Sequence, residues 1–86
     1  MTSALYPHRE SETPVRLPYF DTANAEFSLS QTLRRLAHAS RRDALAWEDA
    51  GHYQNFASCM LEARRLWKDA KYHLARARMH YERALS

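Results

Sequence analysis

Residues 52–86 carry apolar positions that alternate in steps of three and four residues without a break. Large side chains recur at every seventh position, and after Phe56 the second apolar position of each heptad is always alanine. The large set is Tyr53, Met60, Trp67, Leu74 and Tyr81, and the small set is Ala63, Ala70, Ala77 and Ala84. This spacing is typical of a coiled-coil helix, and the alanines form a shallow groove that lets another helix approach closely. It predicts one long helix, over residues 52–85.

A shorter helix is predicted before it, over residues 28–50. Ser28 followed by Gln31 is a capping-box pattern for the start of a helix. The predicted end is at Gly51, the only glycine in the chain, where a left-handed C-cap residue is expected. One face of this helix collects the residues Leu29, Leu33, Leu36, Ala37, Ser40, Ala44 and Trp47.

Two amphipathic helices joined by so short a connection are expected to fold back as an antiparallel hairpin. A turn centred on Gly51 brings Ser40 near Ala63 and Leu33 near Ala70. The predicted fold class is therefore all-α.

The unequal lengths of these helices predict an overhang. At 1.5 Å per residue the first helix is about 32 Å long and the second about 51 Å, so roughly the last twelve residues of the second helix extend beyond the first. Ala77, Tyr81 and Ala84 then have no partner on the first helix. We expect one of three partners to bury these side chains: the chain's own N-terminal segment, a second copy of the chain or a foreign protein.

Residues 1–27 contain Pro7, Pro14 and Pro18 and show no lasting periodicity. Because proline fixes φ and biases the preceding residue toward extended backbone, we interpret them as an extended arm, separate from a hairpin domain at residues 28–86. The second half of this arm carries a patch of apolar residues around Pro18, and two interpretations of the patch remain open. The favoured one folds the patch back onto the helices. In the other, the segment docks on another protein in extended form; its residues are Arg16, Leu17, Pro18, Tyr19 and Phe20.

Length and composition favour a small cytoplasmic module. Eighty-six residues make one small domain at most, and the single cysteine excludes an internal disulfide. Neither a signal-peptide pattern nor a membrane-length apolar stretch is present. The formal charge of +3 permits an acidic protein surface or nucleic acid as partner and requires neither.

Catalytic, metal and cofactor chemistry find no support in the sequence. His73 and His80 share a helix face with Cys59, but a spacing of seven residues, about 10.5 Å along the axis, is too long for one metal ion. One glycine cannot form a phosphate-binding loop, and no serine or cysteine has a nucleophile motif around it. We expect no enzyme activity and no cofactor.

A basic stripe on the second helix is the remaining candidate chemistry. Arg64, Lys68, Lys71 and Arg78 follow one side of the helix, which suits phosphates or an acidic surface. Acidic residues are interleaved and no nucleic-acid-reading motif is present, so a solvated face is the favoured interpretation.

Together these observations predict a non-enzymatic protein-binding module, a small inhibitor, adaptor or regulator that forms a homodimer or binds another protein. By analogy, small helical proteins without a site resemble accessory factors of phages or mobile elements that act on host proteins. A nucleic-acid-binding regulator and a structural subunit of a helical assembly are the alternatives. The residues expected to bind a partner or a second copy are Leu74, Ala77, Tyr81, Ala84, Arg16, Leu17, Tyr19 and Phe20.

Overall fold

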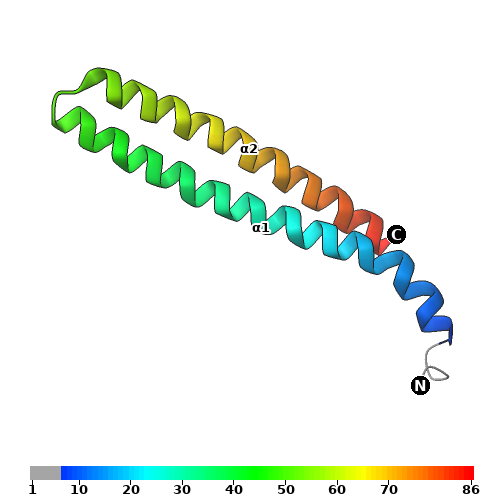
Figure 1. The fold of residues 1–86 in the computed structure, drawn as a ribbon. Coiled ribbons are helices and arrows are strands. Elements are labelled where there is room, and N and C mark those ends of the chain that lie inside the picture. Colours follow the sequence, from blue (N-terminus) through cyan, green and yellow to red (C-terminus); the bar gives the residue numbers. More distant parts are fainter. Residues whose placement is uncertain (1–6) are drawn as a thin grey trace.

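The computed structural model describes the backbone of residues 7–86 and the side chains of residues 18–86. It contains two antiparallel helices, α1 over Pro7–Asp49 and α2 over Tyr53–Leu85, and no strand within these residues (Figure 1). The hairpin is elongated, with principal extents of 68 × 24 × 11 Å. The predicted all-α helical hairpin is confirmed. Neither helix, over the residues described, has an apolar stretch long enough to cross a membrane.

The turn between the helices is a Schellman motif centred on Gly51. Gly51 has φ of 81°, and its N–H donates to the carbonyl of Glu48 at 3.0 Å. The N–H of His52 donates to the carbonyl of Trp47 at 2.9 Å, and the two rings meet edge to face with centroids 5.4 Å apart. These contacts satisfy carbonyls at the end of α1, which explains why the helix stops where the glycine predicts.

The helices meet along a seam of small side chains. In each helix a buried small residue recurs every seven positions: Ala23, Ser30, Ala37 and Ala44 in α1, and Ala63, Ala70, Ala77 and Ala84 in α2. None of these is more than 5% exposed. The Ser30 hydroxyl donates to the backbone carbonyl of Ala70 at 2.8 Å, a contact that requires the two backbones to approach closely.

The face of α1 that packs against α2 differs from the predicted one. Ala37 and Ala44 are buried as expected, but Leu29 and Leu36 remain 42% and 49% exposed. The register also differs, because Ala70 lies opposite Ser30 instead of the predicted Leu33. The physical reason is side-chain size: two small-residue heptads allow a closer approach than leucine against alanine, and this moves the leucines to the sides of the seam.

Helix α1 begins at Pro7, so the predicted start near Ser28 and the extended arm over residues 7–27 were wrong. Tertiary contacts outweigh the low helix propensity of residues 18–27. Ala23 is fully buried in the seam, and Phe20 meets Tyr81 edge to face with ring centroids 5.8 Å apart. Residues 1–6 of the predicted arm lie outside the described residues.

Pro18 stands inside α1, where a proline removes one backbone donor and favours a kink. Figure 1 shows the N-terminal part of α1, in blue, passing the C-terminus of α2 and turning away from the hairpin axis. The Thr22 hydroxyl donates to the Pro18 carbonyl at 2.8 Å.

The predicted overhang of α2 is therefore absent. Ala77 and Ala84 are 2% and 0% exposed because the N-terminal half of α1 covers them. The favoured interpretation of the N-terminal patch, packing against the helices, holds for Phe20, although the patch packs as part of a helix. The overhanging helix is α1, not α2 (Figure 1).

Candidate functional site

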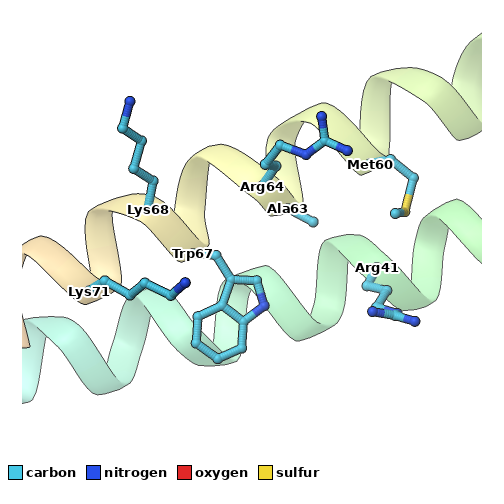
Figure 2. Close-up of a pocket in the computed structure, with 7 residues that line it drawn as sticks. All are labelled: Arg41, Met60, Ala63, Arg64, Trp67, Lys68 and Lys71. Carbon is cyan, nitrogen blue, oxygen red and sulfur yellow. The ribbon is translucent and has the colours of Figure 1, made fainter.

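A basic groove runs along one side of the seam, between α1 and the middle of α2. Its volume is about 560 Å³. It is lined by Arg41 from α1 and by Met60, Ala63, Arg64, Trp67, Lys68 and Lys71 from α2 (Figure 2). Four of these seven residues are basic and none is acidic, so the groove carries a concentrated positive charge.

The side chains of the groove separate into a floor and a rim. In Figure 2 the Met60 and Trp67 side chains reach from α2 toward α1, and the Lys71 ammonium lies beside the indole. Lys68 extends away from α1. Met60 and Trp67 are half-buried, whereas the four basic side chains are exposed. The floor is therefore apolar and the rim is cationic.

Both helices fix the position of the Trp67 ring. The Arg34 guanidinium carbon lies 5.6 Å from the ring centroid, a cation–π distance. The His38 ring approaches with its centroid 5.5 Å away and its plane at 77° to the indole. Since Arg34 belongs to α1, it extends the positive surface across the seam from the groove.

Three of the four residues of the predicted basic stripe line this groove: Arg64, Lys68 and Lys71. The fourth, Arg78, is exposed on α2 seven residues beyond Lys71, outside the lining. The sequence prediction missed Arg41 as a member of the same site. Only the antiparallel register places Arg41 beside Arg64, and the sequence signal for that register was the small-residue heptad of α1.

A charge-paired cluster occupies the opposite side of the seam. The Glu26 carboxylate bonds the His73 Nδ1 at 2.5 Å and accepts from the Arg76 Nε at 2.6 Å. Only 14% of the Glu26 side chain is exposed. The hydrogen bond from Arg76, followed by that from His73, lowers the pKa of Glu26, and Glu26 in turn raises the pKa of Arg76. The cluster joins α1 to α2.

A second ion-pair cluster lies within α2. Arg65 contacts Glu62 at 2.6 Å and Asp69 at 3.7 Å, and the hydrogen bond that Arg65 donates to the Glu62 carboxylate raises the pKa of Arg65. All three side chains are about half exposed or more, so the contribution of this cluster to stability is small.

The structure places the predicted partner-binding residues in different environments. Ala77 and Ala84 are buried in the seam against α1. Leu74, Tyr19 and Phe20 are half-buried, and Tyr81 is 43% exposed beside Phe20. The side chains of Arg16 and Leu17 lie outside the described residues. The role of all eight in partner binding or self-association remains a prediction.

Large apolar side chains on both sides of the seam remain exposed. They are Phe27, Leu29, Leu36, Leu45, Trp47, Tyr53, Leu61, Tyr72, Tyr81 and Leu85. Leu29, the half-buried Leu33 and Leu36 follow one another on α1 in steps of four and three residues, so they form a stripe along one side of that helix. We call these three residues the leucine stripe. It was predicted to pack against α2.

Residues with metal-ligating side chains form no group of three or more within the part of the chain that the structure describes. The three residues that share a face of α2 have different environments: His73 pairs with Glu26, His80 is buried and Cys59 is half-buried.

Comparisons of this chain with protein-family models, with curated proteins and with solved structures find no match.

Proposed function

We propose that this hairpin is a non-enzymatic protein-binding module, a small inhibitor, adaptor or regulator of another protein. The observation that carries the proposal is the division of its side chains by size. Apart from Leu66, the buried apolar residues of the described chain are alanines, while ten large apolar residues are exposed. Exposed apolar surface on this scale marks an interaction site in many proteins.

The leucine stripe supports the proposal because its spacing fits recognition by a helix or a groove. Apolar anchors at positions i, i+4 and i+7 are those with which an amphipathic helix fills an apolar groove of its partner. Leu29 and Leu36 remain about half exposed, so their burial in a complex still removes apolar area from water. A second copy of the chain can use the same stripe, and we therefore also propose that the protein forms a homodimer when its partner is absent.

The chemistry of the described residues supports a role without catalysis. The carboxylate–histidine contact, Glu26 with His73, is shared with Arg76 and joins the two helices. No nucleophile motif accompanies it in the sequence. We place the protein in the cytoplasm, a proposal that rests on its single cysteine.

A pull-down from lysate of the source cells tests the function, with the wild-type chain and a Leu29→Glu/Leu36→Glu variant as bait. The matched control is Gln31→Glu/Thr32→Glu, which places the same added charge on exposed positions of the same helix. We expect the wild type and the control to retain one protein in stoichiometric amount after nuclease treatment, and the stripe variant to lose it. Equal retention by all three baits contradicts the use of the stripe, and no stoichiometric protein on any bait contradicts the function.

A nucleic-acid-binding regulator is the second candidate, and the specific observation in its favour is the basic groove. Four basic residues of the groove, with Arg34 beside them, provide several phosphate contacts. This candidate predicts an affinity for duplex or single-stranded DNA that falls steeply with salt, with a log-log slope that becomes shallower in an Arg64→Gln/Lys71→Gln variant. Binding that is independent of salt or of these two charges counts against it.

A further inference from the structure

The basic groove has features of a binding site for a particular kind of protein segment. We propose that it receives an acidic amphipathic helix of a partner protein, which lies along the seam as a third helix. This inference rests on the proposed protein-binding function and adds the chemistry of the partner.

The apolar floor of the groove suits an apolar side chain of the partner helix. Met60 and Trp67 stand one heptad apart with Ala63 between them, and this arrangement leaves a recess between two large groups. The volume of about 560 Å³ lies within the range of ligand-sized pockets. A leucine or aromatic side chain of a helix that lies over the seam enters such a recess as a knob enters a hole.

The basic residues of the rim determine where the partner helix would carry its carboxylates. Arg64, Lys68 and Lys71 follow one another along α2 in steps of four and three residues, and Arg41 stands on α1 across the groove. Glutamate or aspartate residues with the same three-and-four spacing on a third helix lie opposite these cations. The rim thus selects a helix that is apolar toward the seam and acidic at its edges.

No ion pair within the described part of the chain neutralises the rim charges. Among the described residues, the ion pairs involve Arg65, His73 and Arg76, and none of these lines the groove. The cations of the groove therefore face solvent. An acidic partner gains charge complementarity there without breaking an ion pair of the described residues.

The floor favours a protein over nucleic acid. A single strand binds mainly through bases stacked on exposed aromatic faces and through phosphates. Here Arg34 lies over the Trp67 ring and His38 contacts it edge to face, so the indole is engaged within the chain. Phosphates alone bury none of the apolar floor formed with Met60 and Ala63.

Charge also disfavours a second copy in this groove. A two-fold dimer through this face places the same patch on both sides of the interface, so basic rims face one another. The chain also carries a net charge of +3, which adds to the repulsion between copies.

A fluorescence titration tests the inference on the full chain. Trp47→Phe leaves Trp67 as the only tryptophan. The probes are a synthetic helical peptide of about 20 residues with leucine and glutamate at heptad spacing, and a single-stranded oligonucleotide of about 20 nucleotides. Each probe is titrated into the Trp47→Phe chain and into two further variants of that chain, which have the same net charge as each other. Arg64→Gln/Lys71→Gln removes rim charges, and Arg42→Gln/Arg83→Gln removes exposed charges outside the groove.

We expect the peptide to change the Trp67 emission and to bind at least about tenfold more weakly to the rim variant, with less than about a twofold change in the control. Circular dichroism checks that each variant keeps its helices. Absence of peptide binding, equal loss in both variants, or binding of the oligonucleotide alone overturns the inference. Light scattering that shows a dimer sensitive to the rim variant also overturns it, in favour of a second copy.

The protein-binding function and the binding of an acidic helix in the basic groove can be contradicted independently. If the pull-down retains a stoichiometric protein whose capture depends on the leucine stripe but not on Arg64 and Lys71, the groove inference is wrong and the binding function stands. If no protein is retained and the peptide does not bind, both are wrong.

Discussion

The seam of the hairpin and the two surfaces beside it use opposite kinds of side chain. The seam buries small residues, such as Ala37 and Ala70, at every seventh position of each helix. The surfaces beside it hold leucines and aromatic residues that stay partly in water, among them Leu36 and Trp47. Close approach of the backbones, and not the amount of large apolar surface, therefore determines the pairing of these helices. Large apolar side chains are consequently left available for other molecules.

The two surfaces also differ from each other in their use of charge. On one side Glu26 is tied to His73 and Arg76, and these contacts join the helices. On the other side Arg41 and Lys71 line the basic groove without acidic residues in its lining. Charge thus supports the fold on one surface and remains available for binding on the other.

The largest expected effect comes from filling the seam. Ala37→Leu inserts three carbon atoms at a fully buried position and forces the helices apart, so we expect a loss of about 1–3 kcal/mol in the free energy of unfolding. Ala46→Leu is the matched control, since Ala46 is exposed on the same helix. Urea denaturation followed by circular dichroism measures both. Equal effects of the two substitutions contradict the account of the seam.

A smaller loss is expected from the hydrogen bond of Ser30 within the seam. Ser30→Ala removes the hydroxyl that bonds the Ala70 carbonyl, at an expected cost of about 0.5–1.5 kcal/mol. Because serine-to-alanine also raises helix propensity, Ser58→Ala at an exposed position of α2 serves as the control. The difference between the two unfolding free energies isolates the hydrogen bond, and a difference near zero argues that it contributes nothing.

The charge-paired surface predicts a dependence of stability on pH. The pKa of Glu26 is lowered in the folded chain from its ordinary value of 4.5, chiefly by the hydrogen bond from Arg76. The folded state therefore binds this proton less readily than the unfolded state. The stabilisation is present above pH 4.5 and is lost as the pH falls through the lowered pKa.

Unfolding free energies measured between pH 6 and about 3 check this dependence. We expect Glu26→Gln to lower stability at pH 6 and to flatten the decline toward acid. The control Glu82→Gln changes an exposed carboxylate of α2 and is expected to leave the decline unchanged. An identical acid profile for the wild type and Glu26→Gln rules out the role of this cluster.

The sequence predicted α2 and the end of α1 because each depends on a local signal. The alternating steps of three and four residues defined α2, and Gly51 defined the turn through its left-handed backbone. The start of α1 and the register could not be predicted in the same way. Prolines gave a local signal for extended backbone, and contacts distant in sequence, such as Phe20 with Tyr81, outweighed it.

Prediction of the candidate site was limited by the same distant contacts. The steps from Arg64 to Lys68 and Lys71 were visible in the sequence and placed these residues on one side of a helix. Arg41 joins them only through the register between the helices. That register follows from the small-residue heptad of α1, of which the predicted apolar face contained only Ala37 and Ala44.

The exposed leucines of α1, such as Leu36, do not belong to the core of the chain itself. The most direct test is the free energy of unfolding of Leu36→Ala, measured by urea denaturation beside the wild type. Because Leu36 is 49% exposed, we expect the free energy of unfolding to change by no more than about 0.5 kcal/mol, as for surface substitutions. A loss of about 2–5 kcal/mol, which is typical of a leucine truncated inside a core, contradicts the account.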